Sequence, residues 1–289
     1  MARVLLYVCI IVMPLTGYVS VNFTRRPVSF FGLDLPVWGA PARPHDMLLS
    51  RRRLLACAGR QAMNPISHLL LASGLFLATH FVSSTPLRAK LSGALGAAYL
   101  AVYSTVAFAT LGWMTWAYHR APFFNLWYSV ELRWVPLVAM PFAFVLFVCG
   151  LAARNPTMVG HERLLKAAEP ARGILRVTRH PLMWAFALWA ASHIVARGDS
   201  ASVVFFGAFL VLALAGPWLI DRRKRAALGA DWRHFAAVTS NVPFAAIAAG
   251  RNRFRPGEFA PWQLGVAVVL YAAFLVLHQA LFGAHALYS

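Results

Sequence analysis

Three histidines stand where the surrounding residues give an imidazole ring no obvious partner. His80 and His193 lie within apolar runs, and His180 opens the run that holds His193. The other seven histidines lie in loops, at the terminus or near the ends of runs, where water or the headgroup layer can satisfy the ring. An imidazole among apolar residues must bond to a backbone carbonyl or a neighbouring helix, or ligate a metal or a haem iron. The residues alone leave both possibilities open.

The segment Thr178-Arg179-His180-Pro181 has the composition of a helix start. Proline fits the first turn because its missing N–H would have no partner there. The free N–H groups of that turn, together with Arg176, Arg179 and His180, favour an anion such as a phosphate, a carboxylate or a haem propionate. The alternative is that these arginines only anchor the chain at one face of a membrane.

The composition indicates lipid as the solvent and excludes several classes of protein. Hydrophobic residues make up 60% of the 289-residue chain, more than one soluble core of this size would bury. All nine acidic residues lie between or at the edges of apolar runs, which argues against a proton-coupled carrier or an aspartyl protease. The net charge of +18 is concentrated in loops beside apolar runs, so we expect anionic lipid rather than nucleic acid as the partner. The three cysteines have no CxxC spacing, so neither a disulfide framework nor a zinc site is indicated.

Seven apolar runs have the length and composition of membrane spans, with tryptophans at their ends. We therefore predict an all-α, polytopic transmembrane helix bundle with about six spans after residue 62 and one doubtful span before it. The runs are Val4–Val21, Ile66–Val82, Gly96–Tyr118, Trp134–Leu151, Pro181–Ala196, Ser202–Ile220 and Trp262–Phe282.

The distribution of Lys and Arg predicts the orientation. From Met63 onward, the loops after the second, fourth and sixth runs hold 16 Lys and Arg, and the opposite loops hold 3. By the positive-inside rule the first set is cytoplasmic, so we expect a multi-pass protein of the bacterial inner membrane.

The first 62 residues break this charge pattern, because the loop after Val4–Val21 carries seven arginines on the side predicted to be external. Residues 1–45 resemble a fragment of bacterial di-haem b-type cytochromes, without the helices whose histidines hold haem there. We therefore divide the chain into an N-terminal extension at 1–62, a membrane domain at 63–253 and a C-terminal transmembrane helix at 254–289.

Basic and aromatic residues alternate after Asp221, through Trp232 and Phe235. This pattern predicts a helix that lies in the cytoplasmic interface and anchors the chain to lipid. The Asn241–Phe244 turn that follows could close a pocket.

Several spaced motifs, in this order, resemble the NnrU family from about Met63 to Arg253. They are Thr79-His80, Arg172-Gly173, Thr178-Arg179-His180-Pro181, Leu188-Trp189 with His193, Asp221-Arg222-Arg223, Asn241–Phe244 and Gly250-Arg251. The resemblance implies an integral membrane protein associated with nitrite and nitric oxide reduction. The same family includes a plant haem b enzyme that isomerises a double bond of a carotenoid.

That resemblance also implies haem b, with His80 and His193 as iron ligands and Arg179 or Arg88 near the propionates. Ala190 stands where the plant enzyme has a cysteine, so a switch to thiolate ligation is not available here. The depths of the two histidines differ, because His193 lies 13 residues past His180, about 20 Å along a helix axis. By depth alone His80 pairs more easily with His180.

Two other functions remain open. The Arg-His-Pro helix start and the basic C-terminal segment also resemble isoprenylcysteine carboxyl methyltransferases, in which Arg179 and His180 would hold the carboxylate of adenosylmethionine. The chain could instead be a non-catalytic accessory subunit of a respiratory reductase. The expected partners are membrane lipids and either such a reductase or a hydrophobic isoprenoid substrate.

Overall fold

The apolar runs form long helices in the computed structural model, which describes residues 28–30, 33–35, 64–158, 161–167, 169–283 and 286. Six helices are 17 residues or longer: α3 (Pro65–Val82), α5 (Tyr99–Arg120), α6 (Trp134–Ala152), α8 (Pro181–Arg197), α9 (Ser200–Val238) and α11 (Pro261–Phe282). Each of the six runs predicted after Met63 lies mainly within one of them. The run Val4–Val21 lies outside the described residues.

Short elements connect the long helices. They are α4 (Leu87–Leu95), α7 (Ile174–Val177) and α10 (Ala245–Ala248), and the 3-10 turns η1 (Gly96–Ala98), η2 (Val130–Arg133), η3 (Glu162–Lys166) and η4 (Pro256–Glu258). In the N-terminal extension, β1 (Val28–Phe30) and β2 (Leu33–Leu35) pair antiparallel, with Val28 opposite Leu35.

Five helical segments are long and apolar enough to cross a membrane: 65–82, 87–120, 130–152, 200–238 and 261–282. The sixth long helix, α8, has 17 residues, about 25 Å at 1.5 Å per residue, which is at the lower limit for a span. It packs between α6 and α9. The predicted all-α, multi-pass membrane bundle is confirmed.

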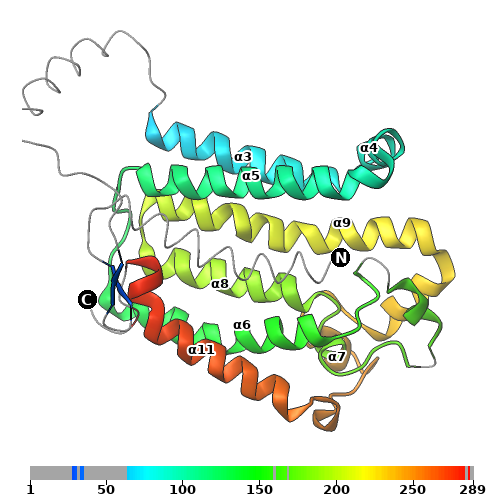
Figure 1. The fold of residues 1–289 in the computed structure, drawn as a ribbon. Coiled ribbons are helices and arrows are strands. Elements are labelled where there is room, and N and C mark those ends of the chain that lie inside the picture. The colour runs from blue at the N-terminus through cyan, green and yellow to red at the C-terminus, as the bar shows by residue number, and fades with distance from the viewer. Residues whose placement is uncertain are drawn as a thin grey trace, which may run out of the picture.

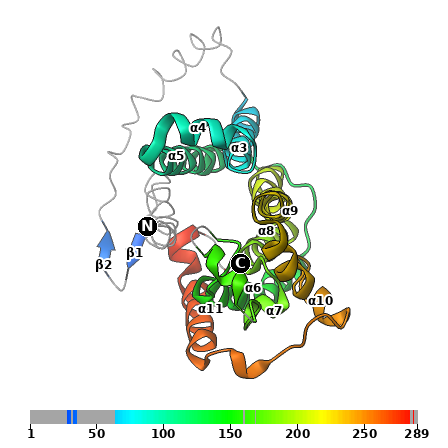
Figure 2. The same ribbon diagram turned by 90° about the vertical axis from the view of Figure 1, so that its right-hand side faces the viewer.

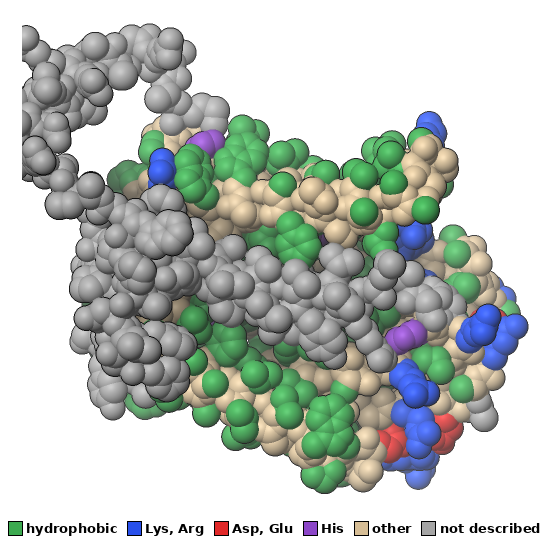
Figure 3. All heavy atoms as spheres, viewed as in Figure 1, with side chains coloured by type: hydrophobic (Ala, Val, Ile, Leu, Met, Phe, Trp, Pro, Cys, Tyr) green, Lys and Arg blue, Asp and Glu red, His purple; other side chains and the backbone are tan. Residues whose placement is uncertain are grey.

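The long helices pack side by side in the order α5, α3, α9, α8, α6 and α11. An end-on view shows that they follow a curved row, with α3 and α5 at one end and α11 at the other (Figure 2). Hydrophobic side chains cover the flanks, whereas most visible Lys and Arg gather at the end that holds α7 (Figures 1 and 3). α8 lies in the interior of this row and contacts α6 and α9 on its two sides.

The turn between α8 and α9 is tight and closely covered. Gly198 adopts a left-handed conformation with φ of 62°, and Asp199 caps α9 by accepting a hydrogen bond from the Ser202 N–H at 2.9 Å. The backbone N–H groups of Leu126 and Trp127 donate to the Gly198 carbonyl at 2.8 and 3.1 Å. The loop between α5 and α6 is thereby fixed against this turn.

The segment after Asp221 differs from the predicted interfacial helix. It continues α9 to Val238, with a break at Gly229, where φ is 51° and ψ is −116°. Trp232 and Phe235 are fully buried and pack against Leu165 and Ala171. The interfacial position expected for this segment is therefore wrong for these two rings, because the chain before α7 covers the face that they present.

We predict that Gly198→Ala strongly destabilises the protein. A methyl group there would lie 2.0 Å from the Trp127 carbonyl oxygen, and the left-handed conformation alone costs a non-glycine residue about 1 to 3 kcal/mol. The measurement is the thermal unfolding midpoint in a neutral detergent. Gly207→Ala is the control, since a methyl group at this α9 position meets nothing within 4 Å. Equal midpoints for the two variants would contradict the assignment of this turn.

Candidate functional site

Asp221 holds the residues at the start of α8. Its Oδ1 lies 2.7 Å from Nε2 of His180, and its Oδ2 accepts a hydrogen bond from Nε of Arg179 at 2.8 Å. His180 and Asp221 are both buried. One carboxylate on α9 therefore bonds two consecutive residues that lie between α7 and α8.

The chain after α9 closes over the same residues. Nη1 of Arg179 donates to the carbonyl and hydroxyl oxygens of Thr239 at 3.1 and 3.2 Å. The Thr178 hydroxyl and the Trp184 indole N–H both donate to the carbonyl of Asn241, at 2.6 and 2.9 Å. The Asn241–Phe244 turn thus lies directly on the His180 segment, as part of one hydrogen-bonded unit.

This arrangement supplies the anion that the helix start favours. The anion near Arg179 and His180 is the carboxylate of Asp221, 41 residues from His180 in the sequence. Since Nε2 of His180 already bonds to Asp221, His180 is not placed to ligate a haem iron through that atom. Arg179 is likewise engaged by Asp221 and not placed to receive a propionate. The sequence signal for Asp221 was an acidic residue at the end of an otherwise apolar run.

Arg176 has its own carboxylate partner in Glu258, just before α11. Nε and Nη2 of Arg176 donate to the two oxygens of Glu258 at 2.8 and 2.7 Å, and the Gly173 N–H donates to Oε2 at 2.6 Å. The hydrogen bonds from Arg176, then that from Gly173 and the positive charges of Arg176 and Arg255, lower the pKa of Glu258 to about 2. The same pairing raises the pKa of Arg176. The arginine expected to bind an external anion thus has a carboxylate partner within the protein.

His80 and His193 share a geometry that suits a ligand. In each, Nδ1 lies 2.7 Å from the carbonyl oxygen four residues earlier, Phe76 for His80 and Trp189 for His193. When Nδ1 carries the proton of that bond, Nε2 has a free lone pair, and metal-ligating histidines are usually fixed in this way. The His193 ring also stacks on Phe206 at 5.2 Å. Each histidine by itself can serve as an axial ligand.

The structure does not bring these two histidines together. Three rings lie between them: Trp189 beside His193, then Phe209 at 5.1 Å from Trp189, and Phe76 at 5.2 Å from Phe209 and 4.1 Å from His80. Two axial ligands each approach the iron to about 2 Å, and the intervening ring contacts do not favour a haem shared by both histidines. The expected pairing of His80 with His193 therefore stays a prediction, and each histidine by itself has the geometry of a ligand.

His278 and Arg88 are the other polar residues relevant to His193 and His80. His278 on α11 lies close enough to His193 for their charges to interact, a neighbour that the spacing of the histidines did not indicate. Arg88 lies on α4, beyond the end of α3 that carries His80. Among the described residues, no group of three or more His, Cys, Asp and Glu could hold a metal ion.

We predict that Asp221→Asn destabilises the protein by about 3 to 5 kcal/mol, the usual effect of removing one partner from a buried ion pair. Arg179 would keep its charge without the carboxylate that balances it. The unfolding midpoint in detergent checks this, with Asp231→Asn as the control on an exposed position of the same helix. Similar midpoints for both variants would contradict the structural role of Asp221.

The Glu258 pair predicts a defined pH dependence. The carboxylate with a folded pKa of about 2 stabilises the fold fully above about pH 4.5, its usual range, and loses this effect as the pH falls toward 2. The difference in unfolding midpoint between the wild type and Glu258→Gln is expected to be constant from pH 7 to 5 and to shrink below pH 4.5. A difference that is absent at pH 7, or that grows on acidification, would refute this prediction.

Comparison with known proteins agrees with the resemblance seen in the motifs. The model of the family described as NnrU protein matches residues 68–286, which extends past Arg253 and includes α11. The chain is 36% identical over 81 residues to 15-cis-zeta-carotene isomerase, chloroplastic, from Zea mays. It is 35% identical over 80 residues to the protein of the same name from Arabidopsis thaliana. Each match covers 28% of this chain and 22% of the relative.

No solved structure matches the chain. The two isomerases share only a limited segment with it, whereas the family model covers all six long helices with the exception of the first residues of α3. The chain therefore belongs to the NnrU family.

Proposed function

We propose that the chain isomerises a double bond of a carotenoid-like isoprenoid in the bacterial inner membrane. The observation that carries the proposal is the sequence similarity to two carotene isomerases, which lies within a protein of transmembrane helices. The location in a bacterial membrane is part of the proposal and is supported by the uneven distribution of Lys and Arg between the two sides.

The aromatic cluster beside His193 suits a flat, apolar substrate. Trp189 on α8 lies with its ring 5.1 Å from those of both Phe206 and Phe209 on α9, and Phe76 continues the cluster onto α3. Aromatic rings also make favourable contacts with the flat π-systems of other groups, so a conjugated substrate suits this environment. Trp189 and His193 are only partly buried, so a polyene could reach this side of the cluster from the bilayer without crossing water.

We further propose that His193 holds haem b. Its ring is fixed by Phe206 and by the bond to the Trp189 carbonyl, which orients Nε2 as expected of a ligand. When bound, haem would supply a metal centre whose electronic properties follow from the axial ligand and the surrounding polarity. The role of this chain is then to orient the group, to exclude water with the aromatic cluster, and to hold the substrate beside it.

The methyltransferase alternative is not favoured by the arrangement of its expected binding residues. Arg179 and His180 would have to be available for the carboxylate of adenosylmethionine, but both bond to Asp221. A link to nitrite and nitric oxide reduction and a role as an accessory subunit of a respiratory reductase stay predictions of the family resemblance.

The test uses the purified full chain in a neutral detergent, supplied with haem b and then with a 15-cis polyene. We expect a Soret absorbance band and conversion of the 15-cis isomer, followed by reverse-phase chromatography. His193→Ala is expected to lose both, because it removes the proposed ligand. His80→Ala is expected to keep the band, because three rings separate it from His193.

His119→Ala is the matched control, since this histidine lies at the end of α5 and its ring contacts Tyr118. Loss of the band in His80→Ala and His193→Ala alike would mean that the two histidines ligate one iron after rearrangement. Absence of the band in the wild type would rule out the haem proposal, and absence of conversion would rule out the isomerase proposal.

A further inference from the structure

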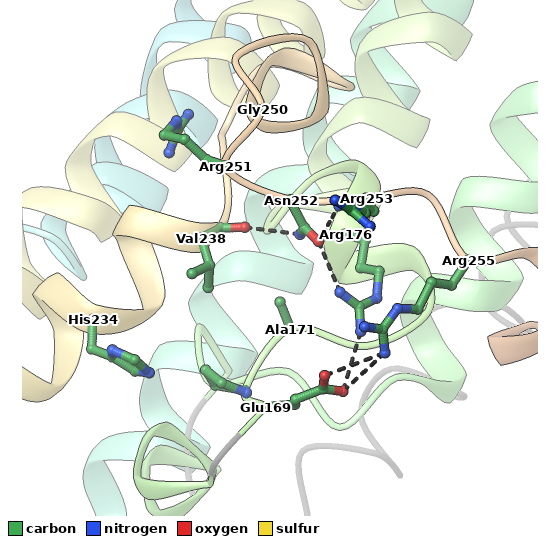
Figure 4. Close-up of a pocket in the computed structure, with 11 residues that line it drawn as sticks. Glu169, Ala171, Arg176, His234, Val238, Gly250, Arg251, Asn252, Arg253 and Arg255 are labelled. Carbon is green, nitrogen blue, oxygen red and sulfur yellow. Dashed lines mark hydrogen bonds and ion pairs between the residues drawn. The ribbon is translucent and has the colours of Figure 1, made fainter.

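A basic hollow lies where three distant segments of the chain meet at the end of the bundle. The last turns of α9 contribute His234, the chain before α7 contributes Glu169, and the stretch after α10 contributes Arg251, Arg253 and Arg255. Arg176 of α7 completes the wall. Figure 4 shows the guanidinium groups of Arg176 and Arg255 side by side next to the Glu169 carboxylate, with His234 across the hollow.

The charges around this hollow do not balance. Four arginines line it, and the two carboxylates bonded to them are Glu169 and Glu258. Four minus two leaves an excess of two positive charges before His234 is counted. Two guanidinium groups that share the same carboxylates repel each other, and a bound anion would relieve that repulsion.

Arg176 and Arg251 are held in place by hydrogen bonds, which distinguishes them from arginines that only set the topology. Arg176 is buried and bonds to Glu258 and to Asn252, the latter at 2.8 Å. Nη1 of Arg251 donates to the carbonyl oxygens of Ala237 and Thr239 at 2.6 and 3.1 Å, so this side chain caps the end of α9. Topology requires positive charge on the correct side of the membrane, but it does not require convergence on one hollow.

The hollow lies at the level where a membrane surface is expected. It borders the end of α9 and the approach to α11, two of the apolar segments long enough to span. Phe244, Phe254 and Trp262, all near the same end, expose 54%, 49% and 58% of their surface, as aromatic residues of the headgroup layer do. By its charge, this is the side predicted to be cytoplasmic.

We propose that this hollow binds the phosphate group of an anionic phospholipid of the cytoplasmic leaflet. Arginine forks match phosphate oxygens in pairs, and the exposed aromatic side chains adjoin the region that the acyl chains of such a lipid would occupy. This site is independent of His80, His180 and His193 and of the proposed isomerase function.

The test measures lipid retention by native mass spectrometry of the full chain in a neutral detergent. Phosphatidylglycerol is titrated against the wild type and the double variant Arg253→Gln/Arg255→Gln. The control is Arg222→Gln/Arg225→Gln, which removes the same charge from exposed positions of α9 on the same side of the membrane. We expect at least a tenfold weaker affinity for the first double variant and less than a twofold change for the control.

Two further arms distinguish the sources of the phosphate group. Phosphatidylcholine is expected to bind at least tenfold more weakly than phosphatidylglycerol, and inorganic phosphate at millimolar concentration is expected to displace little lipid. Equal losses in the two double variants would overturn the proposal in favour of diffuse charge attraction. Full displacement by inorganic phosphate would overturn the lipid as the source. If Arg253→Gln/Arg255→Gln has a lowered unfolding midpoint, Arg253→Gln alone replaces it, with a threefold or greater loss expected and no loss refuting the site.

Discussion

The arrangement of the chain at the basic end of the bundle depends on the bonds that the buried carboxylate of Asp221 forms with Arg179 and His180. Removing a charged group from water is costly, and here the cost is offset because Arg179 and His180 both contact the same carboxylate. The bonds tie α9 to the first residues of α8, and Arg179 extends them to Thr239 beyond the end of α9. Three segments that are far apart in the sequence therefore keep one relative position, and the Asn241–Phe244 turn can rest on them.

Arg176 of α7 and Glu258, just before α11, form a second ion pair, which joins these two parts of the chain. The arginines of this protein thus have two different roles. Some, such as Arg225, are exposed, as expected of residues that set the orientation of a membrane protein. Others are neutralised by carboxylates of the protein and hold its loops together. Composition alone does not separate the two groups, because both lie on the same side of the apolar segments.

The helices could be predicted from the sequence because a span is encoded locally, in about 20 consecutive apolar residues. The start of α8 at Pro181 was also predictable, since proline suits a first helical turn. The partners of Arg176, Arg179 and His180 were not, because Glu258 and Asp221 lie 41 to 82 residues away and only the packing of α7, α8, α9 and α11 brings them close. The burial of the segment of α9 after Gly229 was not predicted for a related reason. Its aromatic residues Trp232 and Phe235 are covered by Leu165 and Ala171. An alternation of basic and aromatic residues in the sequence does not show which part of the chain covers the aromatic rings. The family resemblance indicated both His80 and His193 but not the three rings between them.

The turn at Gly198 and Asp199 has a consequence for how the protein is made. Only two residues separate the end of α8 at Arg197 from the start of α9 at Ser200, so neither helix can enter the bilayer far from the other. α8 is short and contains the polar residues Ser192 and His193, which makes it a poor candidate for insertion alone, whereas the first half of α9 is strongly apolar. The two helices are therefore suited to leave the translocation machinery as one hairpin, with α9 supplying the driving force for both.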